Sequence, residues 1–248
     1  MQLRPFTVLG LVLLPLFLLF TRLGLWQLQR MHEKQDLLDR FAHPAELDLP
    51  QAIADGSLFA HVRVSGRYNL SWHLLLDNKI LDGRVGVHAI TLFQPDDGPP
   101  ILVNRGWLPL PLDRNSLPEI PTPSGQVNIS GTLTRPIEGG VRLGGPEILE
   151  NLAGSRLITY FDMSELNAAV GKKLSPWLIQ LDASDSTGFD GRDWKPTVML
   201  PAQHGAYAVQ WFALALFMPI IWLTLGWRWR YLSKTASDSV SAAENQGE

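Results

Sequence analysis

Two long apolar blocks near the ends of the chain constrain its fold more than any other feature. Residues 206–227 contain no charged side chain. A helix of about 22 residues reaches about 33 Å, enough to cross the hydrocarbon core of a bilayer. Residues 6–20 are equally free of charge, and the apolar run extends to Trp26 if the guanidinium of Arg22 reaches the headgroups. The sequence therefore predicts an integral membrane protein with two transmembrane helices.

The first block has one rival interpretation, a cleaved secretion signal, because Arg4 precedes a leucine-rich core. The segment that follows, TRLGLWQLQR, offers no small-x-small cleavage site, which favours an uncleaved anchor. A mitochondrial transit peptide would need an arginine- and serine-rich amphipathic stretch before the helix, and only the first few residues stand there. We therefore expect a bacterial inner membrane.

Positive charges beside the second block predict the orientation. Arg228, Arg230 and Lys234 follow it directly, which is typical of the cytoplasmic side. The first block gives a weaker, opposite signal, because Arg22 and Arg30 lie after it. Weighting the second block, we predict a cytoplasmic N-terminus (1–5), helices at 6–28 and 204–227, a periplasmic domain (29–203) and a cytoplasmic tail (228–248).

Composition narrows the class of function. Only 18% of residues are charged against 46% hydrophobic, and 21 basic residues face 24 acidic ones. A net charge of −3 provides no general surface for polyanions, so nucleic acid is not expected as a partner, whereas the lipid bilayer is. The absence of cysteine excludes disulfides, thiolate metal sites and a cysteine nucleophile.

The central segment predicts one β-rich α+β domain. We expect the first helix to continue to Pro44, followed by antiparallel strands that alternate with turns. A short helix over MSELNAAV is expected to begin with Ser164 as its cap and to end at Gly171. The strands are predicted at 61–68, 72–77, 87–93, 100–107, 126–134, 156–161 and 176–181, with loops at 109–124, 139–146 and 182–193.

Motifs for enzymatic chemistry are missing from the sequence. It contains no nucleophile elbow, Walker loop, dinucleotide fingerprint or HExxH helix. His61, His73 and His88 lack the spacing of a preformed metal site, and we interpret them as strand or surface histidines. The aspartate-rich loop at 182–193 lacks the calcium-loop register, so we expect a solvated turn.

Polar residues at the membrane boundaries are the informative ones, because burying them is costly. After the first block, Trp26 and Arg30 share a helical face with Arg22, and Gln27 lies beside them. These residues predict either a partner contact or a plain interfacial anchor.

A second boundary cluster opens the second block. His204, Tyr207 and Trp211 are spaced as one stripe of a helix, and Gln210 needs a polar partner near hydrocarbon. A neutral imidazole between aromatic walls suits an axial haem ligand. The alternative is that His204 anchors the helix at the headgroups.

Three segments in this order resemble the Surfeit locus protein family of cytochrome c oxidase assembly. They are GLWQLQRMHEK at 24–34, ILVNRGWLP at 101–109 and HGAYAVQWFALA at 204–215. The resemblance implies a non-enzymatic inner-membrane factor that helps to build the haem a-containing catalytic subunit of the oxidase, together with other assembly factors. It also implies haem a as a possible cofactor, with His204 as the residue in contact with it. Tyr207 and Trp211, on the same stripe, are the aromatic residues that we expect to line the haem.

The second of these three segments can also be interpreted from the chemistry of its residues. Asn104 and Arg105 end a predicted strand, Gly106 permits a tight turn or close backbone approach, and Arg105 with Trp107 forms a cationic and aromatic contact pair. One hypothesis places a partner on this segment. The other is a structural strand end in which Arg105 pairs with a carboxylate of the domain.

Three classes of function follow from these observations. The leading hypothesis is an assembly factor for the haem a-containing oxidase. The alternatives are an accessory subunit of another membrane complex that faces the periplasm and, third, a membrane-bound enzyme, against which the missing catalytic motifs count.

Overall fold

The computed structural model describes residues 5–110, 117–137, 149–150, 155–196 and 199–244. The chain forms two compact units, which are described separately. One comprises residues 1–39 together with 197–248, and the other comprises residues 40–196.

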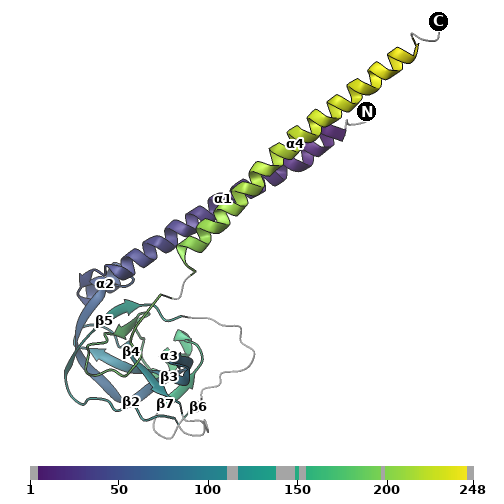
Figure 1. Ribbon diagram of the computed structural model, residues 1–248. Coiled ribbons are helices and arrows are strands. Elements are labelled where there is room, and N and C mark those ends of the chain that lie inside the picture. The colour runs from purple at the N-terminus through teal and green to yellow at the C-terminus, as the bar shows by residue number, and fades with distance from the viewer. Residues whose placement is uncertain (1–4, 111–116, 138–148, 151–154, 197–198, 245–248) are drawn as a thin grey trace. The chain divides into compact units, whose positions relative to one another are not determined.

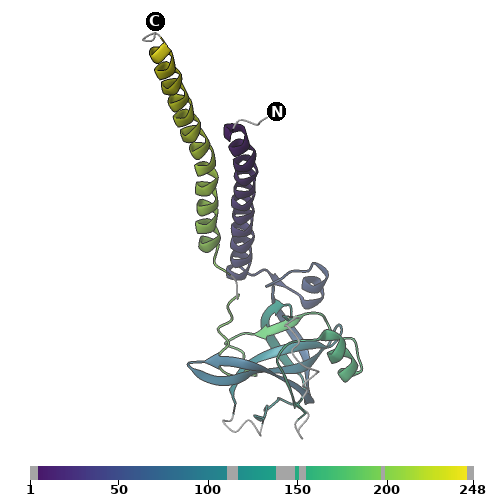
Figure 2. The same ribbon diagram turned by 90° about the vertical axis from the view of Figure 1, so that its right-hand side faces the viewer.

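The first unit is a pair of long helices, α1 (Pro5–Ala42) and α4 (Pro201–Glu244), which lie side by side in both views (Figures 1 and 2). Each is long and apolar enough to cross a membrane. Only 6% and 11% of their most apolar windows are buried within the protein, so these helices are not the core of a soluble fold. The expected pair of membrane helices is thus confirmed, as is the continuation of the first helix to the vicinity of Pro44.

Glycines on one helix opposite aromatic rings on the other allow the two helices to approach closely. A Cβ atom on Gly24 would lie 2.7 Å from Cε1 of Phe212, which is closer than any real contact. Two ring pairs join the helices as well. Phe6 stacks on Trp222 with centroids 4.5 Å apart, and Phe20 stacks on Trp211 at 5.7 Å. This is the close packing that holds helices together in lipid, where hydrophobic burial supplies no attraction.

The second unit is a mixed sheet with two short helices, α2 (Leu49–Ala54) and α3 (Met163–Val170). Among its described residues, eight strands form one sheet. The strands are β1 (Glu46–Leu47), β2 (His61–Leu81), β3 (Arg84–Pro95), β4 (Ile101–Pro109), β5 (Val127–Thr134), β6 (Leu149–Glu150), β7 (Ser155–Ile158) and β8 (Leu178–Leu181).

Five of these strands close into a small barrel. The pairings run from β2 to β3, β4, β8 and β5 and then back to β2. β2 closes the circuit because it is long and irregular, with register shifts after Tyr68 and after Leu76, so its two ends reach different neighbours. Inward residues such as Val62, Phe93 and Ile179 are fully buried and form the main core.

A second core lies where the far half of β2 leaves the barrel. There β2 pairs in parallel with β7, and α3 packs its apolar side, including Leu166, against Leu74 and Ile90. β4 is buried along most of its length because its two faces serve different cores. Val103 belongs to the barrel core, whereas Leu102 belongs to the second one.

Several details correct the sequence-based expectations. The strands predicted at 61–68 and 72–77 are one strand, β2, and the pairs β1–β2, β2–β7 and β4–β8 are parallel, so the sheet is mixed. The cap of α3 is Asp162, whose side chain accepts hydrogen bonds from the backbone N–H groups of Ser164 and Glu165. The predicted end at Gly171 is confirmed by its left-handed backbone, with φ of 67°. The loop predicted at 139–146 lies outside the described residues, as do residues 111–116 of the loop predicted at 109–124.

Candidate functional site

The polar contact between the two long helices joins His204 on α4 to Gln27 on α1. His204 Nδ1 lies 2.8 Å from Gln27 Oε1. A carbonyl oxygen can only accept, so Nδ1–H is the donor. In the neutral imidazole this bond selects the tautomer whose Nε2 carries the lone pair. Gly205, the next residue, faces Met31 of α1 so closely that a Cβ would lie 3.2 Å from its sulfur. This close approach allows the two polar side chains to meet.

The remaining ring nitrogen of His204 has no hydrogen-bond partner. Its Nε2 atom is buried, and none of the described residues donates to it. The whole side chain is only 8% exposed. A buried acceptor without a partner costs about 1–3 kcal/mol, so the helix pair keeps this nitrogen at a cost to stability. The arrangement resembles that of metal-binding histidines, in which one ring nitrogen is held by a hydrogen bond and the other is left for the metal.

The structure places the residues of the predicted stripe, His204, Tyr207 and Trp211, in different surroundings. Trp211 lies in the helix interface with His204 and stacks on Phe20. Tyr207 is 46% exposed. Gln210 is also exposed, and no hydrogen bond joins it to another residue in the described part of the chain.

The cluster after the first apolar block is divided in the same way. Gln27 faces α4, as described above, whereas Arg22, Trp26 and Arg30 share an exposed face of α1. Arg30 approaches the ring of Trp26 at 6.0 Å and pairs with Glu33 at 2.6 Å. The helix therefore has one polar residue for its partner helix and an outer face of mixed cationic and aromatic character.

The segment from Asn104 to Trp107 lies inside the second unit, on β4. Arg105 is 2% exposed, and its guanidinium lies over the rings of Tyr68 and Phe189 at 4.9 and 4.6 Å. It donates to the carbonyl oxygens of Thr187 at 2.8 Å and Pro121 at 2.9 Å. Within the described residues its hydrogen-bond acceptors are carbonyl and hydroxyl oxygens, so the expected pairing with a carboxylate is not the one formed.

Gly106 and Trp107 complete the same internal arrangement. Gly106 has φ of 113°, and a Cβ there would lie 2.6 Å from the carbonyl oxygen of Asp190, so the predicted close backbone approach is confirmed. The backbone N–H of Trp107 donates to that carbonyl at 2.7 Å, and its indole donates to the carbonyl of Lys79 at 3.1 Å. The loop at 182–193, expected to be a solvated turn, is therefore hydrogen-bonded to β4.

Asn104 is buried as well and links β4 to β3. Its Nδ2 donates to His88 Nδ1 at 3.2 Å, and its Oδ1 accepts from the backbone N–H of Gly106 at 3.2 Å. Burial and nearby Lys79 lower the pKa of His88 to about 4, so this histidine is neutral near pH 7 and can accept the bond. Because Asn104, Arg105 and Trp107 are all nearly inaccessible, the structure favours an internal role for this segment over the predicted partner contact.

A third histidine forms an ion-pair cluster that sequence patterns did not reveal. His61 lies 2.7 Å from Asp182 and 2.8 Å from Glu46. Burial by itself lowers the pKa of His61, but the bonds to the two carboxylates outweigh that effect and raise it. The three residues come from distant parts of the chain, so only the fold brings them together. No metal-binding group of three or more such side chains occurs among the residues that the structure covers.

These features define a class of protein, a small β-barrel domain inserted between two membrane helices that meet through a histidine and a glutamine. Comparison with known proteins identifies the family. The SURF1 family matches residues 14–216, and the chain belongs to it, as its three sequence segments had indicated. The chain is also similar to a SURF1-like protein of Rickettsia prowazekii (strain Madrid E), with 23% identity over 219 residues that cover 86% of this chain and 87% of the relative. Membership implies a role in cytochrome oxidase assembly, because the family is known as an assembly factor.

Replacing Arg105 should test its internal role. Arg105→Met keeps the apolar volume but leaves the part-buried carbonyl oxygens of Thr187 and Pro121 without their donor, which costs up to about 1–3 kcal/mol each. We expect the thermal unfolding midpoint of the full chain in detergent to fall by several degrees, as measured by near-ultraviolet circular dichroism. The matched control is Arg67→Met, on the exposed side of β2. Equal midpoints for the two variants would contradict the role.

Proposed function

We propose that this protein assists maturation of the catalytic subunit of a haem a-containing cytochrome c oxidase in the respiratory chain. The family supports the general role, and the two long apolar helices support a site of action in the membrane. The alternatives are an accessory subunit of another membrane complex and, third, a membrane-bound enzyme. A stable subunit would remain in the purified mature complex, whereas an assembly factor would be found with precursors.

We further propose that His204 is the residue through which the protein holds haem a. The observation that carries this proposal is the pairing of Nδ1 with Gln27 while Nε2 stays buried and unpartnered. An uncharged nitrogen with a free lone pair is what haem iron requires, and Trp211, about two turns further along α4, would supply an aromatic wall. Haem a would supply the redox centre that the oxidase needs, and the chain would serve to hold and orient it.

The burial of Nε2 adds a condition to this proposal. An iron atom can reach the nitrogen only after the side chains that cover it have moved. Gln27 would act here as a positioning residue, because its carbonyl fixes the tautomer and the ring orientation of His204. The exposed Tyr207 lies outside the interface and would contact the porphyrin only from the outer side of α4.

The outward-facing polar residues are proposed as the contact with the oxidase subunit. Trp26 and Arg30 on α1 and Gln210 on α4 lie on exposed faces of the helix pair. An amide such as that of Gln210 gains most from a partner where water is absent, and a neighbouring helix can provide one. Other assembly factors are candidates for the same faces.

The proposed location is the bacterial inner membrane, with the sheet domain in the periplasm. Arg228 and Arg230 after the second span support this orientation. Alkaline phosphatase fused after residue 124 is expected to be active, and the same enzyme fused after residue 233 inactive. The reverse pattern of activity would show that the domain lies in the cytoplasm.

Deletion of the gene is expected to lower cytochrome c oxidase activity and the haem a absorption of membranes, while transcription of the oxidase subunits continues. The reason is that an assembly factor acts after its client has been synthesised. Oxidase activity and difference spectra of membranes provide the measurement. Unchanged activity and haem content, in a strain without a second copy of the gene, would remove support for the role.

Haem ligation can be tested on protein purified in detergent from cells that make haem a. Wild-type protein is expected to retain haem, and His204→Ala to lose it or shift its absorption in a reduced-minus-oxidised spectrum. Gln27→Leu should weaken retention about 10- to 100-fold, the usual effect of removing a partner that orients a metal ligand.

Gln210→Leu is the matched control, because it removes an amide from the same helix pair but outside the interface. It should leave the spectrum unchanged while lowering oxidase assembly. A wild-type spectrum for His204→Ala, together with full oxidase assembly, would show that this histidine is an interfacial anchor.

A further inference from the structure

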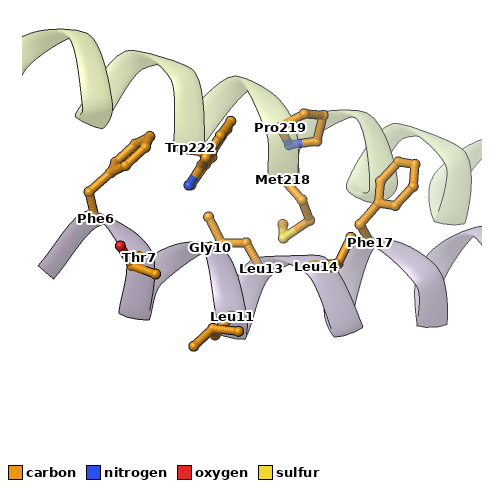
Figure 3. Close-up of a pocket in the computed structure, with 10 residues that line it drawn as sticks. All are labelled: Phe6, Thr7, Gly10, Leu11, Leu13, Leu14, Phe17, Met218, Pro219 and Trp222. Atoms are coloured by element: carbon orange, nitrogen blue, oxygen red, sulfur yellow. The ribbon is translucent and has the colours of Figure 1, made fainter. Parts of the chain in front are cut away.

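An apolar groove between α1 and α4 lies far along both helices from His204. It has a volume of about 600 Å³ (Figure 3). Its walls are formed mainly by Phe6, Leu14 and Phe17 of α1 and by Met218 and Trp222 of α4. Trp222 lies 18 residues from His204 in the helix, or about 27 Å at 1.5 Å per residue, so the groove is separate from the proposed haem position.

The groove contains one buried hydrogen-bond donor without an acceptor. The indole Nε1 of Trp222 is buried, and no acceptor for it occurs in the described part of the chain. Figure 3 shows this nitrogen turned toward α1 at Gly10. A Cβ on Gly10 would lie 2.9 Å from Nε1, so the missing side chain makes room for the indole. With no water available in hydrocarbon, an unpaired N–H group is costly. A flip of the indole that turned its N–H from Gly10 to the groove would let a bound molecule with an acceptor satisfy it.

The length of the groove indicates what it can hold. Phe6 and Phe17 are 11 residues apart, which corresponds to about 16 Å along a helix. Half of a hydrocarbon core is about 15 Å thick. Phe6 also stands at the very start of the apolar block. The groove therefore extends from the membrane surface to the middle of the bilayer, which is the depth occupied by one acyl chain.

We propose that this groove binds one acyl chain of a membrane glycerolipid from the leaflet at this end of the pair. The ester carbonyl of the lipid accepts a hydrogen bond from Nε1–H of Trp222 once the indole, whose nitrogen is buried against Gly10, has flipped this edge toward the groove. The groove's lining carries no charged side chain, so recognition rests on the chain and its ester and not on the headgroup. The proposal does not depend on the proposed function.

A planar isoprenoid quinone, which also carries a carbonyl oxygen, fits less well. Phe6 and Trp222 already stack on each other with centroids 4.5 Å apart and planes inclined by 20°. That contact leaves no space for a third ring between them. A linear chain needs no such space and can lie along the aliphatic side chains that line the rest of the groove.

The test compares a lipid that has ester carbonyls with one that lacks them. The full chain is reconstituted in vesicles of equimolar diester and diether phosphatidylcholine with matched chains, and the lipid retained by the protein is identified by native mass spectrometry. Wild type is expected to retain the diester lipid about fivefold more than the diether lipid, which corresponds to one hydrogen bond of about 1 kcal/mol. Trp222→Phe keeps an aromatic ring opposite Phe6 but removes the donor, so its ratio should fall to about one.

Trp227→Phe is the matched control, because this tryptophan is on the same helix but 77% exposed. It should keep the wild-type ratio. Gly10→Leu should abolish retention of both lipids, since its side chain would displace the indole and fill the groove. A ratio of about one in wild type, or an unchanged ratio in Trp222→Phe, would overturn the proposal. So would displacement of the lipid by ubiquinone added in molar excess over the protein.

Discussion

Helices in lipid gain no hydrophobic stabilisation from packing together, and this constraint shapes the first unit of the protein. Close packing and polar contacts must provide the attraction instead. Gly24 brings α1 against Phe212 of α4 more closely than any side chain would permit. That approach lets Gln27 reach His204, and the resulting hydrogen bond holds the imidazole in one tautomer. The polar pair and the aromatic packing are therefore parts of one arrangement, because the hydrogen bond can form only if the helices are already close.

The sheet domain also buries a polar group that needs hydrogen-bond partners, in this case the charged side chain of Arg105. Arg105 is nearly inaccessible, yet its guanidinium is enclosed by two aromatic rings and by carbonyl oxygens from two loops. Taking this guanidinium out of water is costly. Its hydrogen bonds to the carbonyl oxygens offset that cost only if both loops stay in place. Gly106 lets the segment at Asp190 approach β4 and closes the arrangement from the other side. The segment from Asn104 to Trp107, whose sequence also allowed a contact with a partner, thus holds two loops against the barrel.

The sequence predicted what local rules determine. The two spans, the strand-rich centre and the left-handed end of α3 at Gly171 all follow from composition, periodicity and residue type. It could not show that β2 bends through two irregularities and closes a barrel, because closure depends on pairings between distant strands. The His204 to Gln27 contact escaped detection for the same reason, since 177 residues separate its partners. Both residues were nevertheless singled out, because polar groups beside a membrane are costly and need an explanation.

Each boundary segment presents two surfaces, one that faces the other long helix and one that faces outward. Neighbouring residues of a helix point about 100° apart, so Trp26 and Gln27 lie on different faces of α1. Gln27 turns toward α4, while Trp26 and Arg30 face outward. On α4, His204 and Trp211 turn inward and Gln210 outward. A substitution on the inner surface therefore alters the helix pair and whatever its histidine holds, whereas one on the outer surface alters only what the pair meets. Because the two surfaces carry different residues, their effects can be separated by single substitutions.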